Sequence, residues 1–337
     1  MSTKKLADIP VSILDLVPIL SGKTASDSFK NSLDLAQHAE KWGYNRYWLA
    51  EHHNMAGIAS SATSLLIGYI AGGTSSIRVG SGGIMLPNHA PLIVAEQFGT
   101  LETMYPGRID LGLGRAPGTD QLTSMALRRD LMGSVEDFPS NVVELRSYLG
   151  PEDPASKVKA VPGHGLNIPI WILGSSTFGA QLAGMLGMPY AFASHFAPAA
   201  LQMALKVYRD SFQPSEYLKE PYVMACINVV AADTNEEAIH LSTSLYLSFL
   251  NVVRGTAKPM LPPVESMEGH WDTNERYAVK QMLRYSFIGS SLTVREELQN
   301  FLDETQVDEV MVASHIYDHS ARLHSYEILS KFFKKSA

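Results

Sequence analysis

Short runs of apolar residues alternate along the chain with longer segments in which apolar residues recur every three or four positions. The first run covers residues 11–16, and the segment after it, about 27–42, ends at Gly43. Continuous apolar runs of this length predict buried strands, and the three-to-four spacing predicts amphipathic helices. The chain therefore starts with a strand followed by a helix.

Eight such units account for most of the 337 residues. The predicted strands cover residues 11–16, 46–50, 77–80, 108–113, 169–173, 190–193, 222–230 and 307–312. The predicted helices cover about residues 27–42, 59–73, 91–104, 139–149, 177–187, 198–212, 235–251 and 319–334. Eight strand–helix units predict an α/β protein with a (β/α)₈ TIM barrel. An open, doubly wound sheet is the alternative, but it more often has fewer units and a glycine-rich loop after its first strand.

Two connections are longer than usual. Residues 114–137 and 252–290 carry glycine, proline and charge without clean periodicity. We interpret them as long insertions after strands four and seven, and loops of this length are commonly lids or binding loops. We found no repeat and no dividing linker. The sequence therefore predicts one domain over residues 1–337, with residues 252–290 as a loop insertion that can serve as a lid or a binding loop.

Charge and cysteine content exclude several classes of protein. The chain has 27 Lys and Arg against 34 Asp and Glu, a net charge of -7, with no basic run before the C-terminal lysines, which argues against a nucleic-acid partner. Its one cysteine, Cys226, cannot form an internal disulfide, as is usual in a reducing compartment. No signal-peptide pattern follows the N-terminus, and no apolar stretch reaches membrane-spanning length. We therefore predict a cytoplasmic protein that does not enter membranes.

Polar residues and glycines follow most of the predicted strands. In a TIM barrel the loops at the carboxyl ends of the strands converge on one pocket, so these residues are the candidates for chemistry. In chain order they are Asp15, Glu51-His52-His53-Asn54, Ser81-Gly82-Gly83, Gly114-Arg115-Ala116-Pro117-Gly118, Gly174-Ser175-Ser176, Ser194-His195 and His315.

The histidines do not form a readable metal motif. His52 and His53 are neighbours on an extended segment and point to opposite faces, so one can face a pocket while the other packs outside. Two hydrogen-bonded structural histidines are the alternative. The sequence has no H-E-x-x-H motif and no closely spaced pair of cysteines. The polar residues at about 318–324 stand where a helix should begin, and polar residues there are more often helix caps than metal ligands. We therefore predict no metal site.

Two segments suit an anion. The stretch 112–118 resembles a dinucleotide-binding loop, but Pro117 takes the place of the third glycine, which leaves Arg115 beside exposed backbone as an anion contact or a structural cation. The segment 174–177 precedes a predicted helix, whose first N–H groups can bind a phosphate, although Ser176 or Thr177 could simply cap the helix. No G-x-S-x-G motif for a hydrolase is present.

In combination, these segments resemble those of a known family. The similarity runs in order from about residue 10 to residue 330, and it is to the bacterial luciferase-like flavin monooxygenases, specifically the single-chain, non-luminous branch. The segments that carry it are Tyr47-Trp48-Leu49-Ala50-Glu51-His52-His53, Val79-Gly80-Ser81-Gly82-Gly83-Ile84-Met85-Leu86-Pro87-Asn88-His89, Pro106-Gly107-Arg108-Ile109-Asp110-Leu111-Gly112-Leu113-Gly114-Arg115 and Ile170-Trp171-Ile172-Leu173-Gly174-Ser175-Ser176.

The resemblance implies a TIM barrel that binds reduced flavin mononucleotide (FMN) and activates dioxygen. It matches His52 to the active-site histidine beside the flavin ring, and Gly82-Gly83 to a pair often joined by a cis peptide bond. It assigns the cofactor contacts to Ser81, Gly82, Gly83, Arg115, Gly174, Ser175, Ser176, Ser194 and His195. Luciferase proper has a reactive cysteine where this chain has Gly114, so light emission is not expected.

The resemblance also implies partners. A separate flavin reductase would supply the reduced FMN, the substrate would be a small apolar molecule such as an aldehyde or ketone, and the protein would form a homodimer. Two other functions fit the same fold: hydride transfer with the deazaflavin F420, and a non-catalytic flavin-binding barrel. F420 carries a long acidic tail, and a net charge of -7 without basic loops argues against it.

Overall fold

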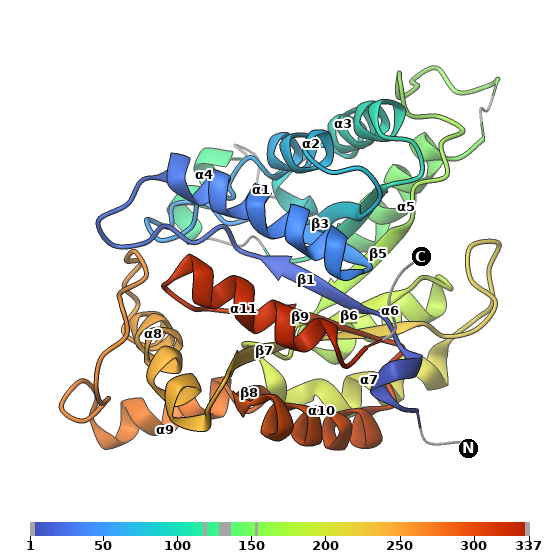
Figure 1. Cartoon of the computed structure of the whole chain (residues 1–337). Coiled ribbons are helices and arrows are strands. Elements are labelled where there is room, and N and C mark those ends of the chain that lie inside the picture. The colour runs from blue at the N-terminus through green and yellow to red at the C-terminus, as the bar shows by residue number, and fades with distance from the viewer. Residues whose placement is uncertain (1–3, 117–119, 128–135, 152–153, 334–337) are drawn as a thin grey trace.

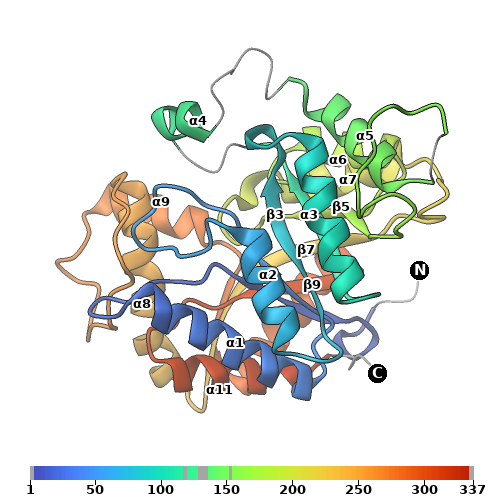
Figure 2. The same cartoon turned by 90° about the horizontal axis from the view of Figure 1, so that it is seen from above.

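Eight parallel strands close into a barrel with helices on the outside (Figures 1 and 2). The structure is a computed structural model and describes residues 4–116, 120–127, 136–151 and 154–333. The barrel strands are β1 (Val11–Asp15), β2 (Arg46–Leu49), β3 (Arg78–Met85), β4 (Ile109–Gly114), β5 (Ile170–Gly174), β6 (Tyr190–Phe192), β7 (Val223–Ala232) and β9 (Glu309–Ala313). Each pairs with the next, and β9 pairs with both β7 and β1, so the sheet has no free edge there. The predicted TIM barrel is confirmed.

The strands alternate with helices that run back along the outside of the barrel. These helices are α1 (Ala25–Trp42), α2 (Thr63–Gly72), α3 (Pro91–Met104), α5 (Phe138–Leu149), α6 (Thr177–Met185), α7 (Leu201–Ser211), α8 (Asn235–Val253), α10 (Ser291–Thr305) and α11 (His319–Ser330). Short 3₁₀ turns cover Leu6–Asp8, Leu86–Asn88 and Pro198–Ala200. The helices start at the carboxyl ends of the strands, which lie on the left of Figure 1.

Local sequence explains where these helices begin and end. Helix α1 starts at a capping box in which Thr24 and Asp27 bind each other's backbone N–H groups, and it ends at Gly43 with a φ of 82°. Its buried side chains include Leu35, Ala36 and Ala39, which pack on the barrel. The predicted helix 27–42 therefore forms because its caps and its apolar stripe agree.

The region between β7 and β9 differs from the prediction. Residues 252–290 contain helix α9 (Thr273–Met282) and strand β8 (Ser286–Ser290), and α10 follows directly, so the insertion holds regular elements that the sequence pattern did not predict. Strand β8 pairs in parallel with the second half of β7, outside the closed barrel. The periodicity of α9 is weak because Val279 is its one buried residue.

The insertion after β4 also contains a helix, α4 (Gln121–Leu127). It lies on the same side of the molecule as α9 (Figures 1 and 2). Pro117 and Gly118, which belong to the predicted anion-binding stretch, lie outside the described residues.

At the amino-terminal end of the barrel, charged side chains pair with one another. Arg46 contacts both Asp110, at 2.7 Å, and Glu309, at 3.2 Å, and Arg78 contacts Asp110 at 2.6 Å. Both carboxylates are fully buried. Burial alone would raise the pKa of Asp110, but the charges of Arg46 and Arg78 outweigh it and hold that pKa below its ordinary value. This network therefore joins β2, β3, β4 and β9 at one end of the barrel.

Across the described part of the chain, every helix is too short or too polar to cross a lipid bilayer.

Candidate active site

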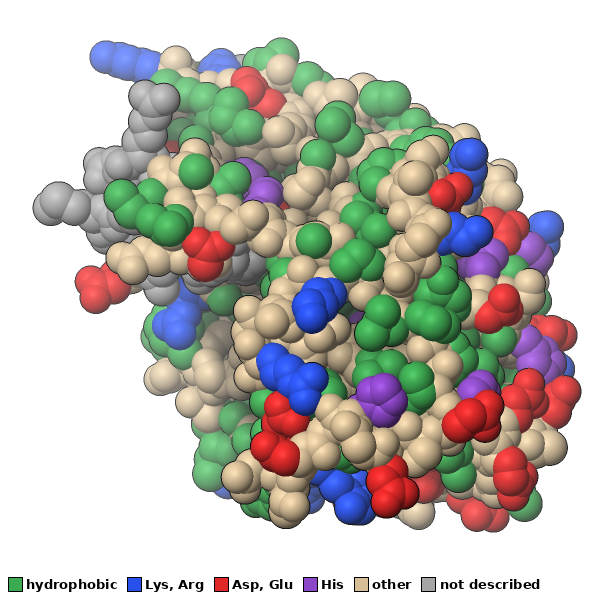
Figure 3. Space-filling model, turned by 90° about the vertical axis from the view of Figure 1, so that its left-hand side faces the viewer, with side chains coloured by type: hydrophobic (Ala, Val, Ile, Leu, Met, Phe, Trp, Pro, Cys, Tyr) green, Lys and Arg blue, Asp and Glu red, His purple; other side chains and the backbone are tan. Residues whose placement is uncertain are grey.

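The candidate residues gather at the carboxyl-terminal end of the barrel. Figure 3 looks onto this face: hydrophobic side chains cover much of its middle, and acidic side chains are concentrated at the lower right of the view. The loops after β2, β6 and β9 bring His52, His195 and His315 to this end. The three histidines therefore lie at the same end of the barrel.

These three histidines share one property. In each ring the Nδ1 atom is buried and has no hydrogen-bond partner. Buried ring nitrogens are normally paired, so three unpaired ones from three separate loops indicate a place where a ligand or water completes the bonding. The ring of His315 also lies edge-on to Phe249 of α8, with centroids 5.9 Å apart, and His195 lies edge-on to Phe196 at 4.9 Å.

All three rings are neutral near neutral pH. Burial, together with the nearby charges that His315 and His52 would carry, lowers the pKa of His195 to about 3. Burial, with the charge of Arg322, lowers the pKa of His315 to about 4, and burial likewise lowers the pKa of His52. Because a charge on His52 or His315 would lower the pKa of His195, the three rings lie close enough to interact electrostatically. A neutral imidazole offers one N–H donor and one acceptor nitrogen.

His53 has a different environment from His52. Its Nε2 lies 2.8 Å from Oε1 of the buried Glu51, and Nε2 of His89 lies at the same distance from that oxygen. The N–H of Met85 donates to the other oxygen of Glu51 at 3.0 Å. Glu51 thus ties the loop after β2 to the end of β3, while His52 keeps a free nitrogen. His52 and His53 therefore have different surroundings, as expected for neighbouring side chains on an extended segment.

Strand β3 carries the predicted glycine pair. The Gly82–Gly83 peptide bond is cis, as the family resemblance implied. A Cβ atom at Gly82 would lie 2.6 Å from Leu14 Cδ1, and one at Gly83 would lie 2.7 Å from the carbonyl oxygen of Gly112. The hydroxyl of Ser81 donates to that same carbonyl and accepts from the Gly112 N–H. The backbone contact therefore requires a glycine at position 83 whatever ligand is bound, whereas a side chain at position 82 would need Leu14 to move. Ser81 positions the strand.

The predicted anion contacts are close to one another. The Arg115 guanidinium stacks on the ring of Phe178, 4.0 Å from its centroid, and Phe178 lies in the first turn of α6. Ser176 is the N-cap of this helix, but its side chain makes no capping hydrogen bond. Ser175 and Ser176 are exposed. Arg115 and the α6 N-terminus can therefore act together on one phosphate group.

Substitution at Gly114 is restricted by its surroundings. A Cβ atom there would lie 2.9 Å from Met85 Sδ, so a cysteine at this position would need Met85 to move. Cys226 is buried in β7, and burial raises the pKa of its thiol. Cys226 therefore packs as a small apolar side chain.

Sequence reasoning missed Asn228. This residue is buried in the middle of β7, where the strand changes its partner from β9 to β8. Its side-chain amide donates to the carbonyl of His195 at 2.6 Å, and its Oδ1 atom has no partner. Ser194 donates to the carbonyl of Cys226 at 2.6 Å and so also fixes this loop. In the sequence, Asn228 interrupts a continuous apolar run. A single amide in a buried strand is the feature by which this residue could have been found.

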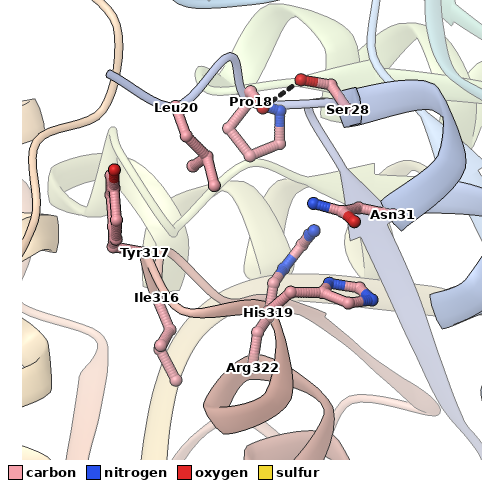
Figure 4. Close-up of a pocket in the computed structure, with 8 residues that line it drawn as sticks. All are labelled: Pro18, Leu20, Ser28, Asn31, Ile316, Tyr317, His319 and Arg322. Atoms are coloured by element: carbon pink, nitrogen blue, oxygen red, sulfur yellow. Dashed lines mark hydrogen bonds between the residues drawn. The ribbon is translucent and has the colours of Figure 1, made fainter. Parts of the chain in front are cut away.

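Asp15, at the end of β1, has a structural role. It accepts hydrogen bonds from Ser32 and Tyr47 and pairs with Arg322 at 2.9 Å. Burial would raise the pKa of Asp15, but Arg322 and these hydrogen bonds hold it below its ordinary value. Nearby, Arg322 and His319 border a cavity beside the β1–α1 loop (Figure 4), whose volume of about 10 Å³ holds at most one water molecule.

The insertion after β7 is attached to this same end of the barrel. The N–H of Met260 donates to the carbonyl of Ile19 at 2.9 Å, and the N–H of Ser21 donates to the carbonyl of Met260 at 2.8 Å. A Cβ atom at Gly57 would lie 2.3 Å from the carbonyl oxygen of Lys258. The insertion therefore packs against the loops after β1 and β2, the second of which carries His52.

These residues fit a flavin phosphate ester. Arg115 and the helix N-terminus suit its phosphate, and unpaired neutral nitrogens suit a ring system that both donates and accepts hydrogen bonds. Within the described residues, no three His, Cys, Asp or Glu side chains are grouped so that they could hold a metal ion.

Comparison with known proteins agrees with this geometry. The family model for luciferase-like monooxygenases matches residues 10–309. A protein of Escherichia coli named luciferase-like monooxygenase is 55% identical over 320 residues, which cover 95% of this chain and 96% of the relative. An N-acetyl-S-alkylcysteine monooxygenase of Bacillus subtilis is 33% identical over 335 residues, 96% of this chain and 97% of the relative.

Solved structures agree as well. The crystal structure of apo-MsnO8 has a TM-score of 0.89 and 34% identity, and the match covers 96% of this chain and 98% of that one. Two more distant proteins share the fold at TM-scores of 0.72 and 0.69: a type II Baeyer–Villiger monooxygenase in complex with FMN, and an F420-dependent secondary alcohol dehydrogenase. Taken with the matched residues 10–309, these similarities show that the chain belongs to the luciferase-like monooxygenase family.

Proposed function

We propose that this protein is a monooxygenase that uses reduced FMN from a separate flavin reductase, together with dioxygen, to oxygenate a small apolar substrate. The observation that carries the proposal is the set of three neutral histidines with unpaired Nδ1 atoms at the end of the barrel where Arg115 adjoins the α6 N-terminus. A distant structural neighbour is described in complex with FMN, which supports the choice of cofactor.

In this proposal Arg115 and the first N–H groups of α6, with Gly174, Ser175 and Ser176, hold the FMN phosphate. His52 donates a hydrogen bond or takes up a proton at its free nitrogen during the oxygenation. Bound in its reduced form, FMN would supply the electrons that activate dioxygen. Gly82, Gly83, Ser194 and His195 would line the flavin pocket, and the insertion of residues 252–290 would act as the lid that excludes water.

Neutral histidines favour an uncharged substrate, such as an aldehyde or ketone. A relative at 33% identity is named for an N-acetyl-S-alkylcysteine, so thioethers belong in the same substrate panel. The test is reconstitution of the purified protein with FMN, a flavin reductase and its nicotinamide donor. We expect FMN binding and substrate-dependent oxygen consumption. A protein that binds neither oxidised nor reduced FMN would contradict the proposal.

F420 is the competing cofactor, because a neighbour of the same fold uses it. Parallel titrations with FMN and F420 separate the two. Preferential binding of F420, with hydride transfer and no oxygen consumption, would favour the dehydrogenase alternative. Binding of FMN without turnover on any substrate would favour the non-catalytic flavin barrel.

The expected homodimer and the cytoplasmic location stay predictions. Helices α2 and α3 expose Leu65, Tyr69, Ile93 and Met104, with fractional exposures of 75%, 44%, 47% and 58%. An apolar surface of this kind is suited to contact with a second copy. Light scattering after size exclusion measures the mass directly. A monomeric mass at micromolar concentration would contradict the dimer.

A further inference from the structure

A second cavity lies at the amino-terminal end of the barrel, opposite the candidate active site. Its volume is about 490 Å³, within the range usual for small-molecule sites. Much of its lining comes from the loops that precede β5, β6 and β7, and the lining includes Arg46, Arg146, Trp171, Glu216, Tyr217 and Tyr222. None of these residues belongs to the proposed flavin site.

Trp171 provides the first indication of a ligand. Its ring lies edge-on to Trp48 and Tyr222, with centroids 5.2 and 5.6 Å away, and the Arg46 guanidinium covers it at 4.9 Å. The residue is 2% exposed, and its buried indole N–H has no hydrogen-bond partner. A buried donor without an acceptor is costly, and Trp171 borders the cavity, so a ligand oxygen that reaches this N–H would lower the free energy of the site.

The charges of the lining select the type of ligand. Arg46 is neutralised by Asp110 and Glu309. Arg146 stacks on Tyr217, 4.7 Å from the ring centroid, and makes no ion pair with the carboxylates of the described residues. It is therefore the lining cation with donors to spare, and a guanidinium suits a carboxylate. The exposed Glu216 on the same rim disfavours a ligand with several negative charges.

We propose that this cavity binds a planar aromatic ring that carries one carboxylate. The ring contacts the aromatic side chains of Trp171, Tyr217 and Tyr222, the carboxylate accepts hydrogen bonds from Arg146, and a ligand oxygen accepts the Trp171 N–H. The site is independent of the proposed flavin chemistry, so this proposal can be tested separately from the function proposed for the other end of the barrel.

The test uses benzoate as the probe and benzamide as its uncharged analogue, with binding followed by calorimetric titration. Arg146→Gln removes the charge at the cavity, and Arg284→Gln is the matched control, because Arg284 also stacks on a tyrosine, at 5.5 Å from Tyr285, but lies outside the cavity. We expect Arg146→Gln to weaken benzoate roughly ten-fold or more, as for a lost charge-assisted hydrogen bond, with little effect on benzamide. Arg284→Gln should change neither affinity.

Trp171→Phe keeps an aromatic ring and removes the N–H, so it should weaken both probes. If that variant does not fold, the Arg146→Gln variant still tests the proposal, because Arg146 is only half-buried and its replacement should not prevent folding. Saturating FMN should leave benzoate binding unchanged. The proposal fails if benzoate does not bind the wild-type protein at millimolar concentration, if Arg146→Gln binds it as tightly as wild type, or if FMN displaces it.

Discussion

Two clusters of buried polar side chains, one at each end of the barrel, differ in how their members are bonded. At the amino-terminal end Arg46, Arg78, Asp110 and Glu309 satisfy one another across four strands. At the carboxyl-terminal end the three histidines each keep an unpaired nitrogen. The charged network stands on the strands themselves, whereas the three histidines stand on the loops that follow β2, β6 and β9.

The contrast separates stability from function. A closed ion-pair network contributes to a unique barrel and leaves few groups for a ligand, whereas neutral unpaired groups cost stability and suit binding. TIM barrels generally place their active sites at the carboxyl-terminal end. The proposed aromatic-acid cavity uses the two groups at the other end, Trp171 and Arg146, that the network leaves unpaired.

The largest expected effect is on catalysis at the carboxyl-terminal end. His52→Ala should lower kcat/KM roughly 10²–10⁴-fold, as for the loss of a general acid or base. FMN affinity should change little, because Arg115 and α6 hold the phosphate in our proposal. His53→Gln is the matched control, since the His53 ring is bonded to Glu51 and should cost much less activity. Equal losses in both variants would contradict the distinction between the two histidines.

At the amino-terminal end the expected effect is on folding. Arg46→Met leaves Asp110 with one cation and Glu309 with none, and it should lower the free energy of unfolding by about 3–5 kcal/mol. Urea denaturation measures this change. Lys206→Met breaks an exposed pair with Asp210 and should cost less than about 0.5 kcal/mol. Similar midpoints for the two variants would show that the buried network does not stabilise the barrel.

The neutral histidines should make the protein sensitive to acid. The pKa of folded His195 is about 3, below its ordinary value near 6.5, so the unfolded chain takes up the proton first as the pH falls. Between about pH 7.5 and about pH 5 this histidine alone should cost about 2 kcal/mol of stability, an effect absent above its unfolded pKa. In His195→Gln the same pH change should cost correspondingly less. Parallel pH profiles of unfolding would contradict the assignment.

The smallest expected effect concerns the phosphate contact. Arg115→Gln should weaken FMN binding roughly ten-fold, since one charge-assisted hydrogen bond is lost. Riboflavin lacks the phosphate, so its affinity should not change. Quenching of flavin fluorescence measures both. A loss of affinity that is equal for FMN and riboflavin would place Arg115 against the ring system and not at the phosphate.

Much of the barrel could be predicted because its signals are local. Helix α3 has the predicted bounds Pro91–Met104, since a proline at the first position fits a helix start. Helix α10 carries a readable apolar pattern at Val294, Leu298 and Phe301, but a scheme of one helix for each barrel strand leaves no place for it. Strand β8 is harder to predict from the barrel pattern, since it pairs with β7 outside the closed barrel.

For the candidate site, the sequence by itself determined which residues stand at the strand ends, because parallel strands of a barrel all point the same way. It therefore identified His52, Arg115, Ser176 and His195 as neighbours of one pocket. Only the tertiary structure decided which of them are free to act. Partners distant in the chain occupy the side chains of Asp15, Glu51 and Ser81, and they leave the Nδ1 atoms of three histidines unpaired. Availability for chemistry depends on these long-range contacts, and no local pattern encodes them.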